Sequence, residues 1–148
     1  MARYAVGLVL LFSAAFASAA DPTGVTGYWK PESVVFDGQE QFPDQAARKA
    51  VTLVVRGGEY RVYYCTDEKQ DLGYRLVTAS IRVNPAEKSV ELTVREGERK
   101  GQKCHGTYEV KDGKLYLCYG PADKPRPTEF SAPAGSGLFC EVWAPEKK

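Results

Sequence analysis

Apolar and polar residues alternate along most of the chain, and runs with helical periodicity are almost absent. Residues 52–56 and 59–65 alternate on either side of Gly57-Gly58, a two-residue turn that tolerates positive φ angles. A second such turn is Asp112-Gly113. It aligns three residue pairs across its hairpin: Lys111–Lys114, Val110–Leu115 and Tyr108–Leu117. These patterns are typical of β-hairpins and predict an antiparallel, all-β protein.

The alternation extends over about eight predicted strands. They span residues 27–36, 50–56, 59–65, 73–83, 89–95, 103–110, 114–119 and 138–143. In the fourth strand, simple counting puts Leu76 and Ile81 on opposite faces. A β-bulge near 78–80 would return both side chains to the interior. Asp44 could cap one helical turn, but the segment is short and follows Pro43, so we expect a loop turn there.

Eight short strands joined by tight turns favour an eight-stranded antiparallel up-and-down barrel, because closure leaves no exposed edge. The connection lengths add an orientation to this barrel. The short connections meet at one end, at 57–58, 84–88 and 111–113. The longer ones meet at the other end, at 37–49, 66–72, 96–102 and 120–137. The sequence therefore predicts a cup with a mouth formed by the long loops.

The first twenty residues have the pattern of a secretory signal peptide. Arg3 precedes the apolar run 4–16, and Ala17-Ser18-Ala19-Ala20 supplies the small residues that signal peptidase accepts. Cleavage near Ala19 to Asp21 would leave one barrel domain, residues 21–148. We therefore expect a secreted or periplasmic protein.

The expected mature chain has no net charge, because the loss of Arg3 leaves 19 basic and 19 acidic residues. A neutral chain of mixed charges has no electrostatic attraction for nucleic acid or for anionic membrane surfaces. After residue 20 no apolar run is long enough to span a bilayer, and no cysteine near the cleavage site could carry a lipid. We expect no nucleic-acid partner, no membrane span and no lipid anchor.

Four cysteines, an even number in a chain expected to be exported, favour disulfides. All four fall near strand ends at the long-loop end of the barrel: Cys65, Cys104, Cys118 and Cys140. Of the three possible pairings, we favour a Cys118–Cys140 bridge between neighbouring strands, which leaves Cys65–Cys104 as the second bridge. Because Cys104 faces inward and Cys118 outward, a Cys104–Cys118 bridge would need a twist near the strand ends. The alternative is a metal site built from thiolates and His105, but no C-x-x-C spacing supports it.

His105 is the single histidine, and strand parity places it on the polar outer face. The chain contains no G-x-S-x-G, no H-E-x-x-H, no phosphate-binding loop and no dinucleotide fingerprint. We expect neither an enzyme nor a bound metal or cofactor.

Tyrosines predominate among the residues that parity places inside the barrel. A tyrosine suits a ligand pocket, because its ring is apolar and its hydroxyl can orient a ligand. The predicted lining consists of Tyr60, Val62, Tyr64, Tyr74, Leu76, Tyr108 and Leu117. The alternative is that these side chains simply fill the barrel. Arg126, held in an extended Pro125-Arg126-Pro127 segment across the mouth, could meet a carboxylate of the protein or of a ligand.

Several motifs together resemble a known family. Gly27-Tyr28-Trp29 is similar to the G-x-W of the first lipocalin strand. The others are Ser33 to Gly38, Asn84-Pro85, Gly106-Thr107-Tyr108-Glu109, Leu115-x-Leu117-Cys118 and Arg126 to Phe130. The ordered set resembles uncharacterised exported lipocalin-like domains abundant in planctomycete bacteria. The resemblance implies a lipocalin-like fold and export, but no activity. One departure is that no arginine follows Arg126 to pack over Trp29.

These observations indicate a lipocalin-like binding module that holds a small, mostly apolar molecule. We expect the ligand to enter between the loops 37–49 and 120–137. The alternative function is an exported protein-interaction module with a filled barrel, which acts through its mouth loops.

Overall fold

The computed structural model describes residues 21–65 and 74–146. The predicted signal peptide (1–20) and the predicted loop 66–72 therefore lie outside the described residues. The elements, in chain order, are β1 (Gly27–Phe36), β2 (Gln39–Glu40), α1 (Gln45–Ala50), β3 (Val51–Arg56), β4 (Glu59–Tyr64), β5 (Tyr74–Asn84), β6 (Ser89–Val94), β7 (Lys103–Lys111), β8 (Lys114–Pro121) and β9 (Phe139–Pro145).

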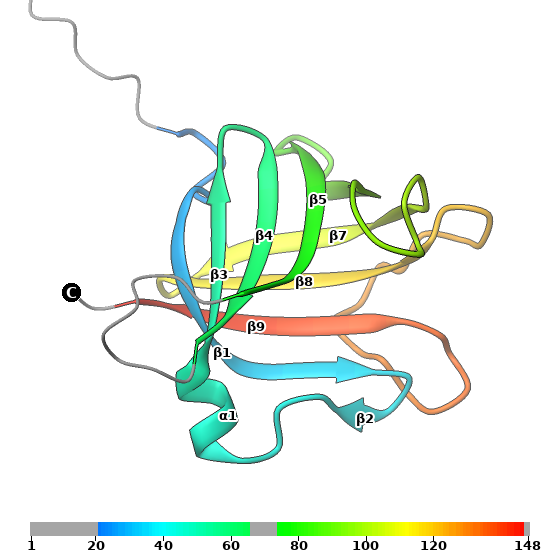
Figure 1. The fold of residues 1–148 in the computed structure, drawn as a ribbon. Coiled ribbons are helices and arrows are strands. Elements are labelled where there is room, and N and C mark those ends of the chain that lie inside the picture. The colour runs from blue at the N-terminus through cyan, green and yellow to red at the C-terminus, as the bar shows by residue number, and fades with distance from the viewer. Residues whose placement is uncertain (1–20, 66–73, 147–148) are drawn as a thin grey trace, which may run out of the picture.

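The strands form one antiparallel sheet in the order β2-β1-β3-β4-β5-β6-β7-β8-β9, and β1 also pairs with β9. Apart from the two-residue β2, they close an eight-stranded up-and-down barrel, consistent with a lipocalin-like all-β fold. Figure 1 shows β1 and β9 side by side, with β3, β4 and β5 running across the direction of β7, β8 and β9. The predicted fold class is confirmed.

β1 bends where it passes from one neighbour to another. Residues Gly27 to Trp29 pair with β3, whereas Val35 and Phe36 pair with β2. The register with β9 shifts between Pro31 and Ser33, which marks a β-bulge. The carbonyl groups at the start of β3 therefore lack ladder partners from β1.

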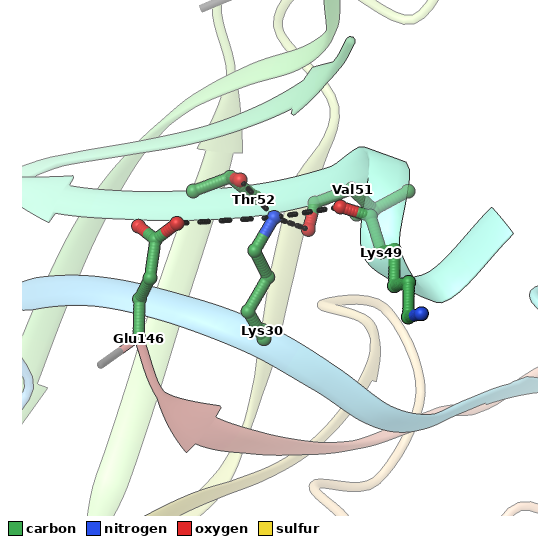
Figure 2. A network of polar contacts seen from close by, with 5 residues as sticks. All are labelled: Lys30, Lys49, Val51, Thr52 and Glu146. Carbon is green, nitrogen blue, oxygen red and sulfur yellow. Dashed lines mark hydrogen bonds and ion pairs between the residues drawn. The ribbon is translucent and has the colours of Figure 1, made fainter. Parts of the chain in front are cut away.

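The side chain of Lys30, which lies in this bend of β1, donates hydrogen bonds to carbonyl groups there (Figure 2). Its Nζ donates to the carbonyl oxygens of Lys49 and Val51, at 2.9 and 3.1 Å. It also donates to Thr52 Oγ1 at 2.8 Å and lies 3.9 Å from Glu146 Oε1. The ammonium group thus joins β1, the end of α1, the start of β3 and the residue after β9.

α1 corrects the expectation of a loop turn after Pro43. The predicted cap is present, because Asp44 Oδ1 accepts from the Ala47 amide at 2.7 Å. The turn continues into a six-residue helix, since its sequence is rich in alanine and Lys30 satisfies the carbonyl of Lys49. In the described parts of the chain, no helix has the length and apolar character that crossing a bilayer requires.

The predicted bulge in β5 is present but lies closer to the start of the strand than residues 78–80. The register shifts after the pair Val62–Val77, which leaves Leu76 as the extra residue. Val77, Ala79 and Ile81 therefore alternate with correct parity. Ala79 and Ile81 are buried, whereas Leu76 and Val77, at the start of the strand, are 44% and 41% exposed. Strand parity requires a bulge in β5 but does not fix its position, because a bulge at any residue between Leu76 and Ile81 restores the alternation.

The end of the barrel at the short turns is filled with side chains, and we call it the closed end. Trp29, Leu53, Leu115 and Trp143 are at most 5% exposed there, on four different strands. In place of the absent arginine, the carbonyl of Val25 accepts the indole proton of Trp29 at 3.0 Å.

Candidate functional site

A cavity of about 690 Å³ opens at the long-loop end of the barrel, and we call it the mouth cavity. Strands β1, β5, β6, β7, β8 and β9 and the turn after β6 all contribute to it. Its lining is Phe36, Leu76, Val77, Val94, Glu96, Gly97, Glu98, Arg99, Gln102, Cys104, Tyr119, Gly120, Pro121, Gly137 and Phe139.

Three aromatic rings from β1, β8 and β9 form one wall of this cavity. The ring centroids of Phe36 and Phe139 are 4.4 Å apart, and those of Phe139 and Tyr119 are 5.3 Å apart in a stacked arrangement. The wall exists because Phe139 is the cross-strand partner of both Phe36 and Tyr119. Rings at such contacts pack against one another and present apolar area along this side of the cavity.

Behind this wall lies a buried carboxylate, that of Glu141 on β9, which is 3% exposed. Tyr119 donates to Oε1 at 2.6 Å, and the Trp143 indole N–H donates to Oε2 at 2.9 Å. The hydroxyl of Tyr60 lies within 3.1 Å of Oε1 and 2.9 Å of Oε2. Three donors therefore satisfy one carboxylate, as a buried charge requires. We call these four residues the Glu141 network.

The network changes the acidity of its members. Burial is the main cause that raises the pKa of Glu141, and its three hydrogen bonds oppose that rise. Burial followed by the charge of Glu141 raises the pKa of Tyr60 and of Tyr119 well above the ordinary value. Both hydroxyls therefore stay protonated and serve as donors to the carboxylate.

Most residues of the predicted lining lie in the filled part of the barrel. Tyr60, Val62, Tyr108 and Leu117 are at most 5% exposed, and they belong to the hydrophobic core. Tyr64 is partly buried against the same core.

The two β5 residues of the predicted lining lie elsewhere. The backbone of Tyr74 pairs with Tyr64 at the start of β5. Leu76 lines the mouth cavity from the bulge, whereas Val77, which sequence reasoning did not select, lines it beside Leu76.

Arg126 is exposed, and no ion pair reaches it among the described residues. Its loop, 122–138, folds back along the outer face of β8. There the ring of Phe130 contacts Tyr116, with centroids 5.8 Å apart. The expected position of this segment across the mouth is therefore wrong, because the loop packs against the outside of the barrel.

The two loops expected to flank the ligand entrance are joined to each other. Asp37 donates its amide to the Leu138 carbonyl at 2.9 Å, and its Oδ1 accepts from the Gly137 amide at 2.8 Å. The mouth cavity is instead bordered on its other side by β5 and the turn from Glu96 to Arg99.

No disulfide joins the four cysteines, all of which lie within the described residues, so the two predicted bridges are wrong. Cys118 and Cys140 are direct cross-strand partners, but their thiols share a hydrogen bond and no S–S bond. That bond lowers the pKa of Cys118 to about 7 and raises the pKa of Cys140. Cys65 directly follows β4 and Cys104 lies on β7, and two strands, β5 and β6, separate them in the sheet.

The predicted facings of the cysteines and of His105 agree with the structure. Cys104 packs against the core and lines the mouth cavity. Cys118 faces outward, where its thiol donates to the Ser131 carbonyl at 3.5 Å. His105 Nε2 donates to the Lys124 carbonyl at 2.6 Å. Within the described residues, no three His, Cys, Asp or Glu side chains gather in a way that could hold a metal ion.

Sequence reasoning missed the Glu141 network, although a signal for it exists. Glu141 alternates with Phe139 and Trp143 along β9, so strand parity alone places its carboxylate inside the barrel. A glutamate flanked by two inward aromatic residues is the pattern that could have revealed it.

No family model matches this sequence, and no curated protein matches it significantly.

Proposed function

We propose that this protein is an exported, lipocalin-like binding module that holds a small, mostly apolar molecule in the mouth cavity. The cavity carries this proposal. Its volume of about 690 Å³ lies within the range of about 300–1,000 Å³ that is typical of ligand sites. Its wall of three aromatic rings offers apolar area, and the Glu141 network beside it offers polar groups.

Export is supported by the signal-like pattern of residues 1–20 and by the motif resemblance. We propose no catalytic role. The cavity thiol, Cys104, is a poor nucleophile, because burial raises its pKa.

The test is equilibrium binding of the neutral fluorescent probe N-phenyl-1-naphthylamine to the purified protein. Val77→Arg places a long charged side chain in the cavity at a position that is 41% exposed. Val110→Arg is the matched control, because Val110 is a 38% exposed strand valine that does not line the cavity.

We expect the wild type and Val110→Arg to bind the probe with equal affinity and Val77→Arg to bind at least about tenfold more weakly. The proposal fails if no protein binds the probe, or if all three proteins bind it equally.

The alternative function, an exported protein-interaction module, is favoured by one observation. The loop 122–138 carries Phe130, which is 37% exposed on the outer face of the barrel. Affinity capture from an envelope extract with wild-type protein and Phe130→Ser tests this function. Retention of every captured partner by the variant argues against it.

A further inference from the structure

We infer that the mouth cavity selects a small apolar amine in its cationic form, with the ammonium group at the Tyr119 end of the cavity. This inference rests on the proposed binding function and names the class of ligand. It follows from the charge behind the aromatic wall and from the direction of the hydrogen bonds there.

The charge that bears on the cavity is that of the Glu141 carboxylate. The donors around Glu141 are two hydroxyl groups and one indole N–H, a set that matches the ionised carboxylate. Among the described residues, no lysine, arginine or histidine forms an ion pair with Glu141. When Glu141 is ionised, the barrel interior thus contains a negative charge that neutral dipoles stabilise but do not neutralise.

The Glu141 carboxylate lies close to the cavity. Tyr119 belongs to both, because it lines the cavity and donates its hydroxyl proton to Glu141 at 2.6 Å. One residue therefore separates the ligand from the carboxylate. Burial reduces dielectric screening, so a charge in this position acts more strongly on the cavity than a surface charge would.

The aromatic wall itself also favours a cation. The single proton of the Tyr119 hydroxyl is committed to Glu141, so this hydroxyl has no proton to donate to a ligand carboxylate. Aromatic rings carry negative π density on their faces, which attracts cations, and three such rings line this cavity. Each feature favours an ammonium group and disfavours a carboxylate.

The charged residues at the opening of the cavity, Glu96, Glu98 and Arg99, do not reverse this preference for a cation. Glu96 forms an ion pair with Arg75 at 3.4 Å, which leaves Glu98 and Arg99 as a pair of opposite charges at the opening. An anionic ligand such as a fatty acid would therefore find no surplus of positive charge among the described lining residues.

The test compares three naphthalene compounds that share a ring system and differ in charge: 1-naphthylmethylamine, 1-naphthylmethanol and 1-naphthoate. Their affinities are measured near neutral pH by displacement of N-phenyl-1-naphthylamine. We expect the amine to bind at least about tenfold more tightly than the alcohol, equivalent to about 1.4 kcal/mol, and the carboxylate to bind most weakly.

Two variants test the origin of the preference. In Glu141→Gln the affinity for the amine relative to the affinity for the alcohol falls to less than about threefold. Glu91→Gln is the matched control, because it makes the same charge change at an exposed position between the inward residues Val90 and Leu92 of β6.

A spectroscopic readout needs no variant and covers the case in which Glu141→Gln does not fold. The indole N–H signals of Trp143 and Trp29 are both observable by NMR, and only Trp143 donates to Glu141. We expect the amine to shift the Trp143 signal more than the alcohol does, while the Trp29 signal stays in place.

The outcomes separate the two claims. If the neutral probe binds but the amine has no advantage, or if the advantage survives in Glu141→Gln, the inference is overturned and the binding function stands. If neither the probe nor any naphthalene compound binds, the proposed function fails together with the inference.

Discussion

At the scale of single residues, Tyr60 illustrates how a buried charge is tolerated. Its hydroxyl lies within hydrogen-bonding distance of both oxygens of Glu141, from a strand on the other side of the barrel. Without this donor, two groups, Tyr119 and Trp143, would have to stabilise the carboxylate alone. The hydroxyl of Tyr60 therefore contributes to stability, although its ring already packs in the core.

Tyr60→Phe should lower the free energy of unfolding by about 1.5–3 kcal/mol, the usual contribution of a hydrogen bond to a charged group. Urea denaturation measures this change. Tyr116→Phe is the control: Tyr116 lies on the outer face against Phe130, and its loss of a hydroxyl should change stability by less than about 0.5 kcal/mol. Equal effects of the two substitutions would contradict the proposed contribution.

Glu141 should make stability depend on pH in a defined direction. Below its ordinary pKa of 4.5, both the folded and the unfolded chain hold the proton, and ionisation costs nothing. As the pH rises from 4.5 through the raised folded pKa, the unfolded chain releases the proton first, so the folded state loses relative stability.

The measurement is the difference in free energy of unfolding between the wild type and Glu141→Gln across this pH range. The difference should move against the wild type as the pH rises and then become constant. All other titrating groups are common to the two proteins. A difference that stays constant with pH, or that moves in favour of the wild type, would show that the pKa of Glu141 is not raised.

At the scale of elements, β7 and β8 approach each other closely at Gly106. A Cβ added there would collide with the carbonyl oxygen of Cys118 and would lie 2.6 Å from the Cα of Tyr119. Gly106 therefore sets the position of the strand that carries Tyr119, and through it the position of the cavity wall.

Gly106→Ala should lower the free energy of unfolding by about 1–3 kcal/mol, because backbone atoms cannot move aside as a flexible side chain can. Alanine usually stabilises a strand relative to glycine, so the steric effect reverses the expected sign. Lys111→Ala, at the exposed end of the same strand, should stay within about 0.5 kcal/mol. Chemical denaturation followed by circular dichroism measures the free energy of unfolding of both variants.

Lys30 also stabilises the packing of these elements. Its hydrogen bonds to neutral carbonyl groups contribute more to the free energy of unfolding than its ion pair with Glu146 does. Lys30→Met removes the donor for two backbone carbonyls and should cost about 1–3 kcal/mol. Glu146→Gln removes only a partly exposed contact at 3.9 Å and should change stability by less than about 0.5 kcal/mol.

Unfolding of both variants at low and at high salt separates the two kinds of interaction. The cost of Lys30→Met should persist at high salt, since hydrogen bonds to carbonyls are screened less than exposed ion pairs. A larger effect for Glu146→Gln than for Lys30→Met would reverse this assignment.

At the scale of the whole molecule, local turn chemistry was enough to predict the barrel. Gly57 and Gly58 have φ angles of 60° and 76°, as their hairpin requires, and the pairs predicted across Asp112-Gly113 are present in the sheet. Each of these features depends on residues close together in the sequence, so alternation and turn type suffice. The two-residue β2 escaped prediction, because it is too short to show any periodicity.

The site could not be predicted in the same way. Whether Tyr60 fills space or lines a cavity depends on how far apart the strands lie, which alternation does not encode. Burial of Glu141 is tolerated only because Tyr60, Tyr119 and Trp143 converge on it from three strands. The interior was therefore predictable as a set of positions, but its division into a packed part and an open part was not.

The packed closed end has a consequence for the proposed binding function. With Trp29, Leu53, Leu115 and Trp143 obstructing one end, the interior is a dead-end compartment and not a conduit. Whatever enters past the aromatic wall must leave by the way it came. A binding module of this shape is suited to sequestering a ligand or to releasing it at the opening, but not to passing it from one end of the barrel to the other.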